Sequence, residues 1–447
     1  MSASMPAGVS IDPVAIRRQD WSVISIVGAA HACSHFFQLV LPTLYLSLAA
    51  EFGYDFAQLG LLASIFFLLS SIGQASSGFV VDRIGPAPVL QFGLACFVGS
   101  GLLIAGANGY IMLCLAAALG GIGNSVFHPV DFSILNHRVS AARLGHAFSA
   151  HGLTGNLGWA LAPIYMATFI QLFGWRGAAL AAAALVAVVL VGTWLGRDVL
   201  VGRRKLAEEV PLQQSGPAGR EAAEPTAVVR KAPDKPDADD LSRKSVGQTL
   251  QTLLAQPALW GAFLFFAFTS IALSAVQNFT IPMLGSVYGV DKVLAGSALS
   301  GYMVAGAVGM ALGGFVASST PRSEFIVFAS LAGAATCFVM LASGWLGPAS
   351  ALFAVALAGL CSGIAGPSRD MLIRRVAPKG ATGTVYGLVY SGMDIGASLG
   401  PVGFGLMLDW GLLRGPWAGA ALSFVLAATL AVAVGRSAAA RRQPAAA

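Results

Sequence analysis

Hydrophobic and polar positions follow one another along this chain in long blocks. Apolar stretches of about 20 residues, the length that lets a helix cross the hydrocarbon of a bilayer, alternate with short polar segments. We expect twelve membrane-spanning helices. They lie at approximately 21–49, 57–80, 88–107, 109–134, 145–172, 176–196, 257–285, 294–318, 325–346, 349–373, 382–409 and 416–435.

A long polar segment interrupts this pattern between the sixth and seventh stretches. Residues 197–256 are rich in proline, alanine and charged residues, a composition that cannot bury enough apolar surface to fold alone. We expect a largely disordered cytoplasmic linker there, with a short surface helix near 241–255. Two six-helix bundles result, at 21–196 and 257–435. The N-terminal segment 1–20 and the tail 436–447 are expected to be cytoplasmic.

Composition agrees with the helix pattern. The chain is 56% hydrophobic and 10% charged, whereas soluble domains have about 25% charged residues. The sequence therefore predicts an all-α polytopic membrane protein, and its long apolar runs do not match the short alternating segments of a β-barrel.

The net charge of +6 is explained by the loops rather than by nucleic-acid binding. Lysine and arginine gather in alternate loops, whereas the opposite loops carry only Arg176, Lys292 and Arg414. Because basic loops stay on the cytoplasmic side, we expect both termini and the linker to be cytoplasmic, in a bacterial-type inner (plasma) membrane.

The motifs of enzymes and metal centres are missing from the sequence. The five cysteines lie in apolar runs without CxxC spacing, which argues against disulfides and thiolate metal sites. The chain has no HExxH, GxSxG or Walker sequence. We therefore expect no enzyme, no cofactor, no bound metal and no direct use of ATP.

The two halves of the chain repeat each other. Residues 121–163 align without a gap on residues 359–401, so that helices four and five recur as helices ten and eleven. The matched pairs are Gly121 with Gly359, Pro129 with Pro367, Gly145 with Gly383, Gly158 with Gly396, and Pro163 with Pro401. Two related six-helix halves are typical of transporters whose site lies between them.

A polar stripe marks the first helix. His31, His35 and Gln38 recur at positions i, i+4 and i+7 and so share one face. At about 1.5 Å per residue, His35 lies near the middle of the membrane. Three interpretations stay open: substrate contact or proton transfer, helix packing through hydrogen bonds, and a transition-metal site formed by the i, i+4 histidine pair.

The fourth helix places His128, Pro129 and Asp131 inside an apolar run. His128 and Asp131 are three residues apart and share a face. An imidazole beside a carboxylate can titrate near neutral pH, as a proton carrier must. Pro129 frees a backbone carbonyl one turn earlier and should kink the helix. We predict a proton-coupling role for both side chains, against a purely structural pair.

Two further helices carry polar side chains at depth. His151 and Asn156 lie in helix five, among glycines that allow close helix packing. Asp394 is the most deeply placed acid, and its partner in the repeat is Asn156. Acids inside the membrane are functional candidates, so His35 and Asp394 join His128 and Asp131 as proton-coupling candidates, while His151 and Asn156 are candidates for the substrate cavity.

The segment after helix two reads GFVVDRIGPAP. It resembles the G-x-x-x-D-R-x-G-R-R signature of the major facilitator superfamily, with Pro86 and Ala87 in place of the last two arginines. The matching positions are Gly78, Asp82, Arg83 and Gly85. The resemblance covers nearly the whole chain. It implies the major facilitator fold, with these four residues as a gate that keeps the cytoplasmic side closed in the outward-facing state.

A subfamily is also indicated. The runs SVFHPVDFSILNHR and RLGHAFSAHGLTGNLGWALAP resemble transporters of the fosmidomycin-resistance type, whose acid directly follows the His-Pro pair; here Val130 intervenes before Asp131. By analogy with the superfamily, Gln277 and Asn278 of helix seven line the central cavity, together with His31 and Gln38. Arg369 either attracts an anionic substrate or belongs to the basic loop after it.

These features predict a secondary transporter that works by alternating access, in a lipid bilayer and as a monomer. Proton-coupled efflux of small molecules or drugs is the first hypothesis, and import of an organic anion or metal chelate is the alternative. A transporter-like sensor would need an output domain, and the polar linker is not suited to form one.

Overall fold

The computed structural model describes residues 13–201, 255–319, 322–376 and 382–440, and these parts of the chain are helices joined by short turns. The N-terminal helices are α1 (Pro13–Gln38), α2 (Val40–Phe52), α3 (Phe56–Ile84), α4 (Pro86–Ala105), α5 (Tyr110–Asn124), α6 (Phe127–Arg138), the 3-10 turn η1 (Ala141–Arg143), α7 (Leu144–Leu195) and α8 (Arg197–Val201). The C-terminal helices are α10 (Pro257–Tyr288), α11 (Lys292–Ser319), α12 (Ser323–Ser343), α13 (Pro348–Val376), α14 (Thr382–Asp409) and α15 (Gly415–Ala440).

Ten stretches of the described chain are long and apolar enough to cross a membrane. One of them, α7, has 52 residues and turns at Gly174, where φ is 70°; at about 1.5 Å per residue it is long enough for two crossings. The 28-residue α14 is not among the ten, although it is as long as its neighbours. If α7 crosses twice and α14 crosses once, the ten stretches give twelve crossings. The count of twelve stays a prediction.

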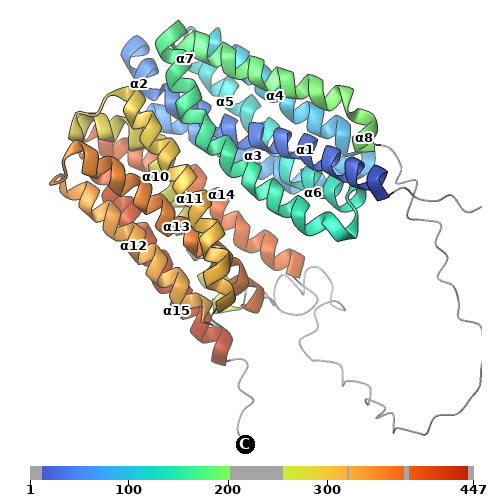
Figure 1. Ribbon diagram of the computed structural model, residues 1–447. Helices are drawn as coiled ribbons and strands as arrows, with labels where there is room; N and C mark the ends of the chain where they lie inside the picture. Colours follow the sequence, from blue (N-terminus) through green and yellow to red (C-terminus); the bar gives the residue numbers. More distant parts are fainter. Residues whose placement is uncertain (1–12, 202–254, 320–321, 377–381, 441–447) are drawn as a thin grey trace, which may run out of the picture.

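The helices form two bundles that follow the sequence order (Figure 1). The N-terminal half contains α1 to α8, and the C-terminal half contains α10 to α15. The halves meet where α3 packs on α14 and where α7 packs on α11. They converge at the end that carries α2 and spread apart toward the end where α1 begins and α15 ends (Figure 1).

Glycines of the internal repeat make equivalent helix contacts in both halves. A Cβ on Gly121 would overlap the Phe66 carbonyl of α3, and one on Gly359 would overlap the Tyr302 carbonyl of α11. Close approach of helix backbones is what small residues permit in membrane bundles.

The second pair of repeated glycines behaves in the same way. A Cβ on Gly158 would overlap the Ala32 carbonyl of α1, and one on Gly396 would overlap the Ala267 carbonyl of α10. The glycines that repeat in the sequence therefore also make equivalent helix–helix contacts in the two halves.

Proline explains the break in the predicted fourth helix. Because Pro129 has no N–H, it cannot bond to the carbonyl of Ser125. The helix is interrupted at that point, since α5 ends at Asn124 and α6 begins at Phe127. The predicted effect of Pro129 is thus seen as an interruption between α5 and α6.

Several contacts close the end at which the halves converge. Asp409 at the end of α14 accepts hydrogen bonds from the backbone N–H groups of Phe56 and Ala57, both at 2.7 Å. The Tyr45 hydroxyl donates to Asn278 Oδ1 at 2.9 Å. These bonds join the two halves directly, at the end opposite to α8 and the beginning of α1.

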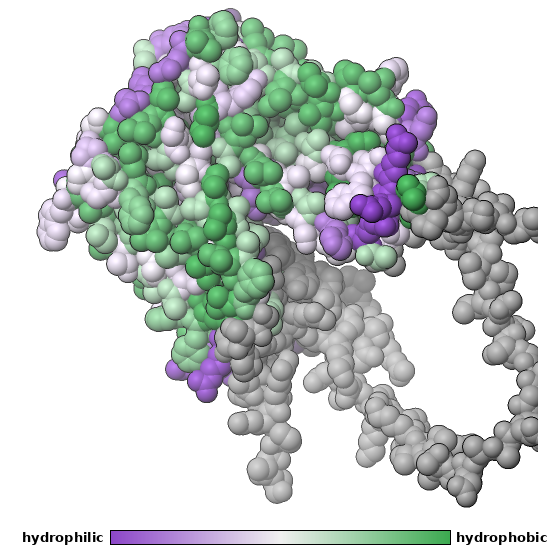
Figure 2. Space-filling model, viewed as in Figure 1, coloured by the Kyte–Doolittle hydropathy of each residue, from purple (hydrophilic) through white to green (hydrophobic). Residues whose placement is uncertain are grey.

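The outer surface is suited to lipid. Hydrophobic residues spread over the visible face, and hydrophilic residues gather toward its ends (Figure 2). Some boundaries differ from those predicted, since α1 begins at Pro13 and α15 continues to Ala440. Residues 197–201 form α8, and most of the expected linker, with the surface helix near 241–255, lies outside the described residues.

Candidate functional site

Three helices of the N-terminal half bring four histidines together. His31 and His35 come from α1, His128 from α6 and His151 from α7. The rings of His31 and His151 are stacked with centroids 3.6 Å apart. The His31 ring centroid lies 4.5 Å from that of His35 and 5.3 Å from that of His128. We call these four residues and Asp131 the imidazole cluster.

Asp131 is the anion of the cluster, and its side chain is fully buried. Its Oδ2 lies 3.1 Å from His31 Nδ1 and 3.1 Å from His151 Nε2. The expected neighbour on its own helix, His128, is not one of these two contacts. A carboxylate in a membrane interior needs such partners, and here they come from α1 and α7.

Three buried polar atoms in the cluster have no hydrogen-bond partner among the described residues: Oδ1 of Asp131, Nδ1 of His35 and Nδ1 of His31. The 3.1 Å contact of His31 Nδ1 with Asp131 Oδ2 is an ion-pair contact rather than a hydrogen bond. Buried polar atoms in native proteins are nearly always paired. The cluster is therefore built to receive something more: a proton, a water molecule or a ligand.

Small and aromatic residues of α7 hold the rings in place. A Cβ on Gly155 would lie 2.9 Å from His31 Nε2 and 2.9 Å from His35 Cε1, so only glycine leaves this space free. The Trp159 ring packs on His35 with centroids 4.2 Å apart, and its Nε1 donates to Gln38 Oε1 at 2.9 Å. Residues of α7 therefore pack against the predicted polar stripe of α1 and hydrogen-bond to it.

A buried network that sequence reasoning missed continues from Gln38. Asn124 at the end of α5 accepts from Ser34 at 2.9 Å and from Gln38 at 3.2 Å, and donates to Ser70 of α3 at 2.8 Å. A clue was present, since Asn124 is a polar residue just before the break at Pro129. The network joins three helices of the same half.

The candidates in the C-terminal half lie in other surroundings. Asn278 is buried and bonds to Tyr45 of the opposite half, so it is a contact between halves. Gln277 is also buried, and its Nε2 has no partner among the described residues. The Arg369 guanidinium lies 5.1 Å from the Phe266 ring centroid of α10, within cation–π range.

Asp394 of α14 is half-buried and lies near Ser71 of α3, whose hydroxyl donates to the Phe67 carbonyl of its own helix at 2.8 Å. This places a titratable group at the contact between the two halves. Its repeat partner, Asn156, donates instead to the Gly152 carbonyl of its own helix at 2.9 Å. Neither residue belongs to the imidazole cluster.

The turn after α3 is partly described. Gly85 has a φ of 88° and joins α3 directly to α4, whose first residue is Pro86. A positive φ is accessible to glycine at little cost, and proline is favoured at the first helical position. Arg83 is exposed, whereas the surroundings of Gly78 and Asp82 lie outside the described residues.

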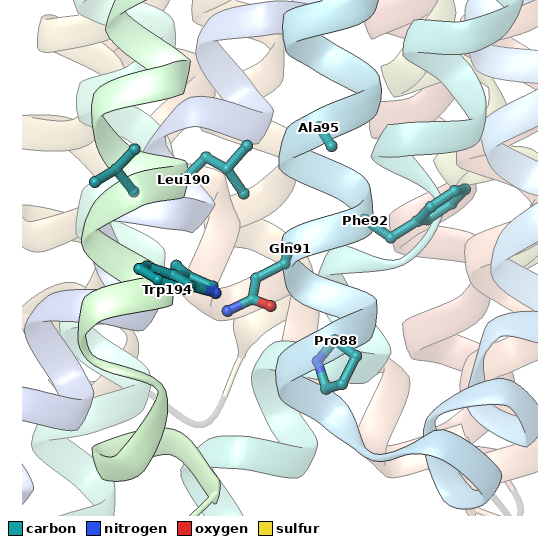
Figure 3. Close-up of a pocket in the computed structure, with 7 residues that line it drawn as sticks. Pro88, Gln91, Phe92, Ala95, Leu190 and Trp194 are labelled. Atoms are coloured by element: carbon teal, nitrogen blue, oxygen red, sulfur yellow. The ribbon is translucent and has the colours of Figure 1, made fainter.

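A groove of about 450 Å³ lies elsewhere, between α4 and the last part of α7 (Figure 3). Figure 3 shows Gln91 and Trp194 projecting toward each other across it. Gln91 Nε2 donates to the Thr193 carbonyl at 3.4 Å. Its lining contains no ionisable side chain, so the imidazole cluster is the better candidate site.

The fold and the cluster define a class: a polytopic helical membrane protein of two similar halves, with polar groups held inside the bundle. The chain belongs to the Major Facilitator Superfamily, whose family model matches residues 26–401 and 263–446. The all-α polytopic fold and the family resemblance expected from the sequence are confirmed.

Individual relatives include a drug-resistance protein and a transporter of this superfamily. The chain is 34% identical over 176 residues to the fosmidomycin resistance protein of Escherichia coli K12, a match that spans 39% of this chain and 43% of that protein. It is 26% identical over 394 residues to the uncharacterized MFS-type transporter YfnC of Bacillus subtilis 168, spanning 87% of each chain.

Solved structures agree in fold. A bacterial homolog of the human lysosomal transporter Spinster, in an inward-facing and unoccupied conformation, superposes with a TM-score of 0.68 at 18% identity. The match covers 96% of this chain and 99% of that one.

Proposed function

We propose that the chain is a proton-coupled exporter of small molecules that works by alternating access, and that Asp394 carries the coupled proton. The carrying observation is the position of Asp394 in α14, against Ser71 of α3. A carboxyl group at the contact between the moving halves senses their relative position. The direction of transport is suggested by the relative named for fosmidomycin resistance.

The physical basis is linkage. If the halves rock, α3 separates from α14 on one side of the membrane, and the surroundings of Asp394 change in that state. A group whose surroundings differ between two states binds its proton with different affinity in each. Proton binding then shifts the equilibrium between the states, and a proton gradient can drive transport.

Asp131 differs from Asp394 in this respect. Its two contacts, His31 and His151, belong to its own half, so rigid rocking leaves them in place. Asp131, His35 and His128 stay predicted proton carriers. The gating role of Gly78, Asp82, Arg83 and Gly85 likewise stays a proposal.

The test of coupling uses proteoliposomes with an imposed proton gradient and fosmidomycin as the probe. We expect Asp394→Asn to abolish gradient-driven movement while exchange down a concentration gradient continues. The matched control is Asp198→Asn in α8, which removes a carboxylate outside the contact between the halves and should leave gradient-driven movement intact. Gradient-driven movement that survives in Asp394→Asn contradicts the proposal.

The same probe separates export from import. Cells that produce the chain should accumulate less fosmidomycin, and collapse of the proton gradient should restore the level found in control cells. Raised accumulation favours the importer, whereas unchanged accumulation excludes fosmidomycin as a substrate.

We also propose that both termini are cytoplasmic, in a plasma membrane. Arg17 and Arg18 at the start of α1 are exposed, as the positive-inside rule requires. A fluorescent protein fused to the C-terminus should then fold and fluoresce, and a periplasmic alkaline phosphatase fused there should be inactive.

A further inference from the structure

We propose that His31, His128 and His151 form a binding site for a divalent transition-metal ion such as Zn²⁺, Co²⁺ or Ni²⁺. The observation is geometric. Each of the three residues offers one ring nitrogen, and these nitrogens all lie within 4.8 Å of one another. The sequence pointed to the adjacent pair His31 and His35 as the metal alternative, but the structure assembles the triad from three separate helices.

The distances are close to those of a bound site. Zinc–nitrogen bonds are about 2.0–2.1 Å, and tetrahedral coordination then separates the nitrogens by about 3.4 Å. The nitrogens must therefore approach one another by at most about 1.4 Å, the difference between 4.8 and 3.4 Å. Side-chain rotation of the imidazoles can supply such a movement.

Asp131 acts as a positioning residue for this site. Metal-binding histidines commonly donate their second ring N–H to a carboxylate, which fixes the tautomer and the ring orientation. Oδ2 of Asp131 contacts one nitrogen of His31 and one of His151. These contacts hold the His31 and His151 rings beside each other within the triad.

Charge also favours a cation. Among the described residues, the ion-pair contacts of Asp131 are with two histidines, which are neutral when they bind metal. A buried carboxylate that lacks a compensating charge is costly. A divalent ion at the triad supplies that charge a few ångströms away.

The site combines rigidity with access. His31 and His151 are buried, whereas His128 is exposed. Closed structural zinc sites use four protein ligands, while open sites keep a free position. The site has three imidazole ligands, and one of them, His128, is accessible. The site can therefore load and release its ion. Release of the ion as cargo, bare or chelated, rests on the proposed transport function, but binding itself does not.

The experiment uses the full-length chain in lipid nanodiscs, metal-free and without a polyhistidine tag. Zn²⁺ and Co²⁺ are titrated against a chromophoric chelator, and bound metal is counted. We expect one ion per chain, and visible absorption bands typical of tetrahedral Co²⁺. His31→Ala, His128→Ala and His151→Ala should each weaken binding at least about tenfold, and Asp131→Asn by about 10- to 100-fold.

The chain supplies matched controls in its two other histidines. His137 and His146 are exposed and lie outside the cluster, so His137→Ala and His146→Ala should bind as the wild type does. Absence of metal binding by the wild type overturns the site. Full metal binding by the variant that combines His31→Ala, His128→Ala and His151→Ala overturns it too, as does an equal loss of affinity in the two control variants.

If the cluster variants fail to fold, X-ray absorption of the zinc-loaded wild type decides. Three imidazole ligands support the site, and any other ligand set overturns it. A chain that binds the ion but does not transport fosmidomycin with protons leaves the site intact and contradicts only the proposed function.

Discussion

The two halves share their packing but not their chemistry. Repeated glycines make equivalent backbone contacts in both halves. At the positions equivalent by the repeat to His128, Asp131 and His151, however, the C-terminal half has Gly366, Arg369 and Val389. The imidazole cluster is therefore confined to one half. The comparison shows that the two halves share the close backbone approach but carry different polar side chains at equivalent positions.

The largest expected effect tests the shared packing. Gly158→Ala and Gly396→Ala each place a Cβ against a backbone carbonyl that cannot move cheaply. Each should cost about 3 kcal/mol or more and reduce the yield of folded protein strongly. Size-exclusion profiles and thermal unfolding measure the loss.

The controls for this prediction are open glycines on the same helices. Gly152→Ala in α7 and Gly403→Ala in α14 meet nothing within 4 Å, so their yield should match that of the wild type. Tolerance of both Gly158→Ala and Gly396→Ala would disprove the packing constraint, and loss in only one of them would disprove the equivalence of the halves.

The second prediction exchanges chemistry between the halves. His151→Val copies Val389, removes one of the two partners of buried Asp131, and should destabilise the fold by about 1–3 kcal/mol. Val389→His buries a polar ring at a fully buried apolar position and should cost a similar amount. Chemical unfolding compares the two. A Val389→His variant that gains stability would show that the C-terminal half also accommodates an imidazole there.

The third prediction concerns the contact that closes the converging end. Asp409→Ala removes the acceptor for two N–H groups at the start of α3. Loss of such a cap costs about 0.5–2 kcal/mol, which should shift the equilibrium between the two states about 2- to 30-fold toward the state with this end open. Distances between spin labels on Asn136 and Ser437, which are exposed in separate halves, report the shift.

Asp55 provides the control for the Asp409 variant. It caps the same helix from within its own half, since its side chain accepts from the N–H of Gln58 at 2.7 Å. Asp55→Ala should lower stability without changing the label distances. A shift of equal size in both variants would show that Asp409 acts on α3 rather than on the contact between halves.

The smallest effect is expected for a single hydroxyl. Tyr45→Phe deletes a bond between the halves, worth about 0.5–1.5 kcal/mol. Tyr302→Phe deletes a bond to Ser362 inside the C-terminal half. Only Tyr45→Phe should change the label distances; a change in Tyr302→Phe instead would place the relevant contact inside a half.

Much of the fold could be predicted from the sequence. Apolar runs locate most of the helices, because a bilayer sets their length. The break near Pro129 follows from the missing N–H of proline. The repeat was also visible, because Gly121, Gly158 and their counterparts cannot be larger without clashing with a carbonyl.

The site was predictable only within single helices. Helical spacing correctly placed His31 and His35 on one face, and it also suggested that Asp131 pairs with His128. The actual partners of Asp131 are 100 and 20 residues away in the sequence, and a local pattern holds no information about such contacts. Asp409 was missed for the same reason, since its partners Phe56 and Ala57 contribute only backbone N–H groups.

One helix connects the cluster to the joint between the halves. The first part of α7 carries His151, and about three turns further on the carbonyl of Pro163 faces Gly296 of α11, at 3.4 Å from where a Cβ would lie. A helix segment of about 18 Å is stiff. A change in the tilt of α7 would therefore displace its contact at Gly296, so the helix that carries His151 also belongs to the joint between the halves.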